Sequence, residues 1–164
     1  MTDVLSALSR PVSVTDIPQE GVNVTVEARP EEREALARDL KLPAIHSLTG
    51  AFHVTGTRSR VHVSGRVDAR IEQICVVTLD PFENEVHEDV EVDFAASAPA
   101  AAQGEDPPDE IVGGTVDLGA LTAEFLALGL DPHPRKPGVD FSFEAADDRA
   151  PSPFAALEKL KPDE

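Results

Sequence analysis

The stretch IHSLTGAFHVTGTRSRVHVSGRVDARIEQIC, residues 45–75, decides the fold of this chain. Apolar and polar residues alternate on both sides of a short polar segment, GTRS at residues 56–59. Strict alternation of this length predicts two long antiparallel strands that bury one face and meet in a tight turn. With the turn centred on Thr57–Arg58, the predicted partners are Val54 with Val61, Phe52 with Val63, and Gly50 with Gly65.

Shorter segments extend this hairpin into a sheet. The same alternation predicts strands at residues 11–17 and 22–27, and a further strand at residues 86–94 after a turn at Asp80–Asn84. Paired glycines in long strands permit a sharp bend. We therefore expect a strongly bent antiparallel sheet, which in its most curled form is a small open barrel.

Two helices complete an α+β fold. Pro30 suits a first helical position, acidic residues follow it, and Pro43 ends the segment. Asp117 suits an N-cap and Gly129 a C-terminal cap for the second helix. The predicted apolar stripe of that helix is Leu118, Leu121, Phe125 and Leu128.

The length fits one domain over residues 1–139, followed by an acidic C-terminal tail at residues 140–164. Residues 95–115 are rich in alanine, proline and acid, which predicts a flexible loop or linker inside the domain. Within the tail, residues 153–160 are a candidate short helix.

The formal charge of −17 is concentrated in one half of the chain. Residues 1–80 carry nine basic and eleven acidic side chains, a sum of −2, whereas residues 81–164 carry five and twenty, a sum of −15. Such a field repels phosphates, so no DNA partner is expected and bulk charge does not favour RNA. Because the N-terminus lacks the pattern of a signal peptide and no apolar stretch reaches membrane-spanning length, we expect a soluble cytoplasmic protein without a membrane partner.

Motifs for catalysis are missing from the sequence. It has no glycine-rich phosphate loop, zinc-protease signature or nucleophile elbow. Cys75, the single cysteine, shares the parity of the buried strand face and is interpreted as a small core residue rather than a catalytic thiol. In the predicted register His53 faces His62, which we interpret as a solvated pair because a third metal ligand is not evident. We expect neither a metal, nor a cofactor, nor an enzyme.

Basic residues gather on the outward face of the long strand. Two interpretations remain open: they neutralise the acidic strand beside them, or they form a patch that binds phosphates or acids. A second basic pair, Arg135 and Lys136, follows the second helix in the acidic half and is a further candidate. The candidate binding residues of the strand are Arg58, Arg60, His62, Arg66 and Arg70.

Two segments carry a family resemblance: VHVSGRVDARIEQICVVTLDPFENEVHEDVEVDF at residues 61–94 and VDLGALTAEFLALGLDPHPRK at residues 116–136. With the helix at residues 30–40, they resemble the YceD-like family of large ribosomal RNA subunit accumulation proteins, in its alphaproteobacterial form. The resemblance covers about residues 10–140 in order. It implies a role in the synthesis, processing or stability of large-subunit (23S) ribosomal RNA, without an assigned active site.

Many members of that family have a Cys-x-x-Cys motif where this chain has Cys75 and, three residues later, Thr78. A metal or redox role of paired cysteines is therefore not carried over. The positions that do match the family pattern, without individual roles, are Cys75, Leu79, Asp80, Pro81, Glu83, Asp117, Leu118, Glu124, Leu126, Leu128 and Pro132.

Three functional hypotheses follow. The first is a non-enzymatic ribosome-biogenesis factor that acts through a basic ribosomal protein or, by its arginine face, on 23S RNA itself. The −15 half favours the protein partner, because it attracts lysine-rich ribosomal proteins and repels naked RNA. The alternatives are a magnesium-dependent RNA-processing enzyme that uses clustered carboxylates, and a generic acidic protein–protein adaptor.

Overall fold

A computed structural model of the chain describes residues 7–96 and 108–139. The tail predicted at residues 140–164, its short helix, and most of the predicted loop lie outside the described residues. The elements in chain order are β1 (Pro11–Ser13), the 3-10 turn η1 (Val14–Asp16), β2 (Val22–Glu27), α1 (Pro30–Asp39), β3 (Ala44–Thr57), β4 (Arg60–Ile74), β5 (Pro81–Ala95), β6 (Asp109–Glu110), β7 (Thr115–Asp117) and α2 (Leu118–Leu128).

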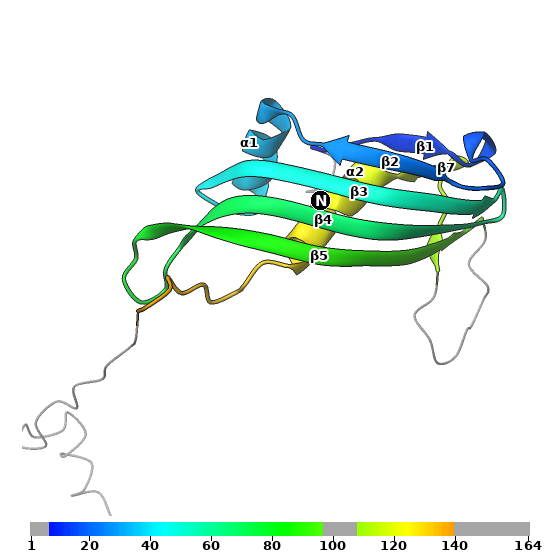
Figure 1. The fold of residues 1–164 in the computed structure, drawn as a ribbon. Helices are drawn as coiled ribbons and strands as arrows, with labels where there is room; N and C mark the ends of the chain where they lie inside the picture. The colour runs from blue at the N-terminus through cyan, green and yellow to red at the C-terminus, as the bar shows by residue number, and fades with distance from the viewer. Residues whose placement is uncertain (1–6, 97–107, 140–164) are drawn as a thin grey trace, which may run out of the picture.

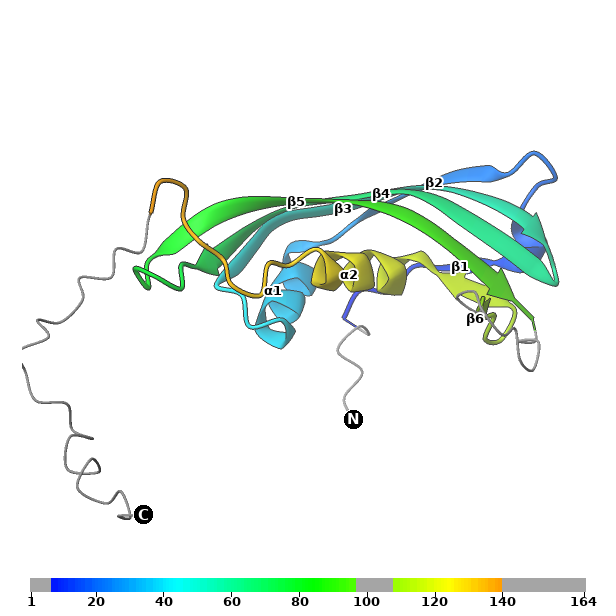
Figure 2. The ribbon, with the colours of Figure 1, turned by 90° about the horizontal axis from the view of Figure 1, so that it is seen from below.

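One bent sheet forms the body of the molecule, and the predicted α+β class is confirmed. Its strand order is β2-β3-β4-β5-β6, with a separate two-stranded pair formed by β1 and β7 (Figure 1). The pairs are antiparallel except for the short parallel pair of β5 and β6. Both helices lie against the same face of the curved sheet (Figure 2). In the described part of the chain the sheet is not closed into a barrel.

The β3–β4 hairpin has the predicted faces but a register that differs from the prediction by two residues. The turn contains two residues, Arg58 and Ser59, between the paired Thr57 and Arg60, so the partners from Ser47 to Thr57 move along by two. A shift by two preserves the side-chain face, whereas a shift by one would reverse it. The observed partners are Val54 with Val63, Phe52 with Gly65, and Gly50 with Val67.

The two glycines of this hairpin therefore do not meet. Each glycine instead lies where another part of the chain comes very close to its Cα atom. A Cβ atom on Gly50 would lie 2.6 Å from the Thr122 hydroxyl of α2 and would overlap the Phe52 ring. A Cβ atom on Gly65 would lie 2.9 Å from the Phe52 Cα and would overlap the Ala51 carbonyl. Because glycine has no side chain, α2 can come close to the backbone at Gly50, and β3 can come close to the backbone at Gly65.

The core lies between the inner sheet face and the helices. Along β4, the inward residues Val61, Val63, Val67 and Ile71 are fully buried, as the alternation predicts. From α2 the chain buries Leu118, Leu121, Thr122, Ala123 and Leu126. The predicted stripe is wrong at its last member: Leu128 is 69% exposed, because the helix ends beside the rim of the sheet where nothing in the described residues covers it.

The local structure also differs from the prediction at three places: the end of the first strand, the turn before β5 and the predicted loop. The first strand ends at Ser13, whose side chain accepts a hydrogen bond from the Thr15 N–H and starts η1. Strand β5 begins at Pro81, so the chain reverses at residues 75–80 rather than at Asp80–Asn84. Within the predicted loop, residues 109–110 form β6 and Ile111 is buried.

Candidate functional site

The outer face of β4 carries the predicted basic residues, and strand β5 lies directly beside it. Arg66 pairs with Asp89, with Nε 3.0 Å and Nη2 2.9 Å from the same carboxylate oxygen. His62 lies opposite Asp93, and its Nδ1 is 3.0 Å from the carboxylate. The hydrogen bond to Asp89 raises the pKa of Arg66. Two of the five candidate residues are thus engaged by the acidic strand, as the neutralising interpretation expects.

The other three arginines stand free of carboxylates in the described residues. Arg58 lies in the hairpin turn, Arg60 lies across from Ala95, and Arg70 lies across from Glu85. All three are exposed, and none makes an ion pair with a described residue. Acidic side chains of β5 interleave with them, so the face is of mixed charge rather than a continuous basic patch.

The predicted pair of histidines is not formed, because the register shift separates them. His53 lies opposite Ser64 and its Nδ1 is 2.8 Å from Oδ1 of Asn23, on β2. A different histidine takes part in the outer face. His87, on β5, has Nδ1 2.6 Å from Asp68 of β4, and this hydrogen bond is the main cause of its raised pKa.

Strand β5 presents acid along its whole outer face. Side chains at every second position from residue 83 to residue 93 are exposed, and all but His87 are carboxylates. The members of this acidic row are Glu83, Glu85, Asp89, Glu91 and Asp93. The sequence shows the concentration of acid but not its position at the edge of the sheet.

On the side away from β4, the β5 backbone before Phe94 is not covered by any strand of the described residues. The Ala95 carbonyl accepts a hydrogen bond from the Ile111 N–H at 2.9 Å, so it points away from β4, whereas the Ala96 N–H donates to Ser59 of the β3–β4 turn. Peptide groups of an antiparallel strand alternate in direction residue by residue. The N–H and C=O groups of the residues that carry the acidic row therefore point outward along the edge. Only residues 94–95 pair with β6, so the rest of β5 has no partner strand there among the described residues.

Cys75 lies in the turn between β4 and β5. It is a free cysteine and fully buried, which confirms the interpretation of a small buried residue. The Lys136 N–H lies 3.4 Å from its Sγ. This hydrogen bond, with others from the hydroxyl and N–H of Thr78, lowers the pKa of Cys75 to about 6. Thr78, which stands where the family has a second cysteine, thus supports the sulfur of the first.

The segment after α2 docks on this turn. The Val76 N–H donates to the Pro134 carbonyl at 2.9 Å, and the Gln73 amide donates to the Asp131 carbonyl at 3.3 Å. Family positions far apart in the sequence therefore meet here, with the exposed candidate residues Arg135 and Lys136 beside them. The family positions at this place are Cys75, Leu79, Asp80, Pro81 and Pro132.

Asp117 joins the N-terminal segment to α2. One carboxylate oxygen accepts hydrogen bonds from the Gly119 and Ala120 N–H groups at 2.9 and 3.1 Å, which confirms the predicted N-cap, and from the Arg10 N–H at 2.7 Å. The other accepts from the Ser9 hydroxyl at 2.6 Å. Burial raises the pKa of Asp117, but these hydrogen bonds outweigh burial and the net pKa is lowered. A Cβ atom on Gly119 would lie 2.7 Å from the backbone nitrogen of Arg10. Glycine at this position therefore lets the N-terminal segment pass close to the start of α2.

The remaining family positions divide into buried and exposed ones. Leu118 and Leu126 are fully buried, whereas Glu124 and Leu128 are exposed. Glu83 lies opposite Glu72 on β4, and one oxygen of each carboxylate is 3.7 Å from the His46 Nε2. His46 occupies the bulge where the β3–β4 register shifts, and this bulge places its ring near the two carboxylates.

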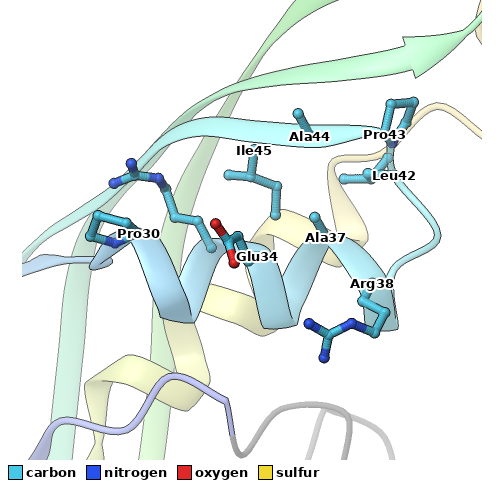
Figure 3. A pocket seen from close by; sticks show the side chains of 9 residues that line it. Pro30, Glu34, Ala37, Arg38, Leu42, Pro43, Ala44 and Ile45 are labelled. Atoms are coloured by element: carbon cyan, nitrogen blue, oxygen red, sulfur yellow. The ribbon is translucent and has the colours of Figure 1, made fainter.

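An open hollow of about 470 Å³ lies between α1 and the start of β3 (Figure 3). Apolar side chains that include Ala37, Leu42 and Ile45 line it. Charged residues of α1, Arg33, Glu34 and Arg38, line it as well. None of the residues predicted as binding positions lines this hollow. Arg33 is held by a hydrogen bond from its Nη1 to the Ala28 carbonyl at 2.9 Å.

Residues 7–96 and 108–139 contain no group of three or more histidine, cysteine, aspartate or glutamate side chains placed to hold a metal ion. In the same residues, no helix has the length and apolarity to cross a membrane.

Comparison with known proteins decides the family. A family model described as "Large ribosomal RNA subunit accumulation protein YceD" matches residues 63–161, more than half of the chain. The chain belongs to the YceD family. The match contains β5, the Cys75 turn, α2 and the segment docked on the turn, whereas Arg58, Arg60, His62 and the hollow beside α1 lie before it. No curated protein and no solved structure matches the chain. Membership implies a role in the accumulation of large-subunit ribosomal RNA.

Proposed function

We propose that this YceD protein supports 23S ribosomal RNA without catalysis, by holding a basic ribosomal protein against its acidic outer face in the cytoplasm. The single observation that carries the proposal is the acidic row on β5, which presents five exposed carboxylates along one strand, of which only Asp89 is ion-paired with an arginine of the described residues. A fixed row of like charges attracts an oppositely charged partner over several ångströms and speeds its association.

The same row argues against RNA as the direct ligand. Phosphate oxygens approaching this face would meet carboxylates on β5 as well as arginines on β4, and Arg66 is already bound to Asp89. Large-subunit ribosomal proteins carry many lysine and arginine side chains that neutralise RNA. A factor that binds such a protein before it meets its RNA keeps it soluble and available for assembly, which is one route to RNA accumulation.

A deletion strain tests the proposal. We expect the deletion to lower the ratio of large-subunit to small-subunit RNA, and the wild-type chain to restore it. A variant with Glu85→Gln and Glu91→Gln should restore the ratio only in part. The matched control is Glu20→Gln with Glu34→Gln, which removes the same charge at exposed positions away from β5 and should restore the ratio fully.

Two outcomes would contradict the proposal, at different levels. An unchanged RNA ratio in the deletion strain would remove the role in 23S RNA for this chain. Full restoration by the β5 double variant would instead leave that role standing and remove the acidic row as its means. A magnesium-dependent cleavage of precursor RNA by the purified protein would show catalysis and overturn the non-enzymatic account.

A further inference from the structure

We propose that the open edge of β5, from Glu85 to Asp93, is a docking edge that takes up an extended basic segment as an added strand. The inference rests on the proposed function for the nature of the partner, a basic ribosomal protein, and adds the mode of binding. Main-chain hydrogen bonds to an exposed edge give such complexes their affinity, and alternate side chains give them specificity.

The geometry of the edge supports an added strand. The segment spans about 27 Å at strand rise, enough for a partner strand of seven to nine residues. Its outward N–H and C=O groups belong to alternate residues, and those of Glu85, His87, Asp89 and Glu91 have no partner strand among the described residues. The pairing of β6 with Phe94 and Ala95 sets the limit of the docking edge at one end.

Side chains on the two faces of β5 define the partner. The outer face adjoining the edge carries the acidic row, which suits lysine or arginine at every second position of the incoming strand. On the inner face of the docking edge Glu88 is half-buried, whereas Val86, Val90 and Val92 pack against the core and only Val92 of these three is partly exposed. An apolar residue at the intervening positions would cover them. The expected segment therefore alternates basic and aliphatic residues.

The acidic row also makes the edge favour a basic strand over a second copy of the same chain. An open edge of this length is a template for pairing with a second copy of the same chain. Two β5 edges would place like charges directly opposite each other, which opposes that pairing. The same charges attract a basic strand. If repelling other copies is the whole purpose of the row, no basic strand will pair with the edge, and the experiment below separates these two cases.

Amide hydrogen exchange measured by NMR on the full chain tests the docking edge. In the free protein, the amides of Glu85, His87, Asp89, Glu91 and Asp93 should exchange fast, and those of the even-numbered residues between them slowly, because only the latter bond to β4. The probe is a capped seven-residue peptide that alternates lysine and valine. On saturation with it, we expect exchange at the outward amides to slow at least tenfold.

Two methylated peptides provide the matched control. One peptide carries N-methyl groups on the backbone nitrogens of all its lysines, and the other on the backbone nitrogens of all its valines. Neither change alters the lysine side chains, so both peptides keep the charge of the probe. An added strand turns only one of these two sets toward β5. One methylated peptide should therefore lose the protection and the other should keep it. Binding of every peptide without protection of the outward amides would reduce the interaction to charge attraction and overturn the proposal.

A variant of the protein tests the docking edge both in peptide binding and in the deletion strain. Glu91→Pro removes one outward N–H and, because that N–H does not bond to β4, should leave the sheet intact. Slow exchange at Val90 and Val92 checks that it does, and Glu91→Gln keeps the N–H as the control. We expect Glu91→Pro to weaken peptide binding at least tenfold and Glu91→Gln by less. Full restoration of the RNA ratio by a folded Glu91→Pro variant would overturn the docking edge while leaving the family role in place.

Discussion

Replacement of Asp117 by alanine should destabilise the whole domain, because one carboxylate joins the N-terminal segment to α2. It receives hydrogen bonds from Gly119, Ala120, Arg10 and Ser9 at distances between 2.6 and 3.1 Å. Loss of an N-cap costs about 0.5–2 kcal/mol. Loss of the bonds from Arg10 and Ser9 adds roughly 1.5–3 kcal/mol, since hydrogen bonds to a charged group are the stronger kind.

Urea unfolding followed by circular dichroism measures this effect. We expect Asp117→Ala to lower the free energy of unfolding by roughly 2–5 kcal/mol, with an unchanged dependence on urea. Asp109→Ala is the control, because that aspartate is exposed on β6 and makes no side-chain hydrogen bond with a described residue. Asp117→Asn keeps an acceptor for the cap and should lose less than Asp117→Ala.

The pH dependence gives a second readout. The pKa of Asp117 is lowered in the folded protein, so its contribution is present above the unfolded pKa and is lost as the pH falls through the folded pKa. Asp117→Asn should therefore remove part of the loss of stability below about pH 4. If Asp117→Ala loses no more stability than Asp109→Ala, the account of Asp117 as the link between the two segments is wrong.

Three further predictions concern the turn and the sheet. Titration of the thiolate absorbance at 240 nm, which is clean because the chain lacks Tyr and Trp, should give a midpoint near 6 for native Cys75 and about 8.5 in urea; equal midpoints would contradict its hydrogen bonds. Because the folded pKa is the lower one, the stability that Cys75 contributes should fall as the pH drops through this window, and Cys75→Ser should remove that dependence. Gly65→Ala should cost about 1–3 kcal/mol in urea unfolding, since a methyl group there overlaps the backbone of β3, whereas Ser64→Ala on the outer face should cost little. The pKa of His87, followed by NMR, should fall toward its ordinary value in Asp68→Asn; the stability linked to its raised pKa is present below the unfolded pKa and is lost as pH rises through the folded one.

Alternation along the chain predicts which face of each strand is buried, but not which residues are partners. Val63 and Phe52 both face the core as predicted, yet Val63 pairs with Val54 and Phe52 with Gly65. The alternation has a period of two, so it does not distinguish registers that differ by two residues. The choice between them depends on the turn, a two-residue connection at Arg58–Ser59 in which neither residue has a positive φ, so the sequence carries none of the glycine or asparagine signals that mark the common hairpin turns.

The candidate site depends on contacts that local sequence patterns do not contain. The arginines and the acids of β4 and β5 are visible in the sequence, and their neutralising contact was one of two open interpretations. The free edge of β5 follows from the strand order, and the donors around Cys75 come from Thr78 and from a segment about sixty residues away. The cap at Asp117 was predictable because it is local, whereas its bonds to Ser9 and Arg10 were not.

Direct binding of the purified chain tests the central claim, that the acidic row holds a basic ribosomal protein. The immobilised chain would be presented at physiological salt with proteins extracted from large ribosomal subunits and, separately, with protein-free 23S RNA. We predict that it retains a basic ribosomal protein after nuclease treatment, and that Glu85→Gln with Glu91→Gln weakens this binding while Glu20→Gln with Glu34→Gln does not. Retention of protein-free 23S RNA, with no ribosomal protein bound once nuclease is added, would contradict the claim.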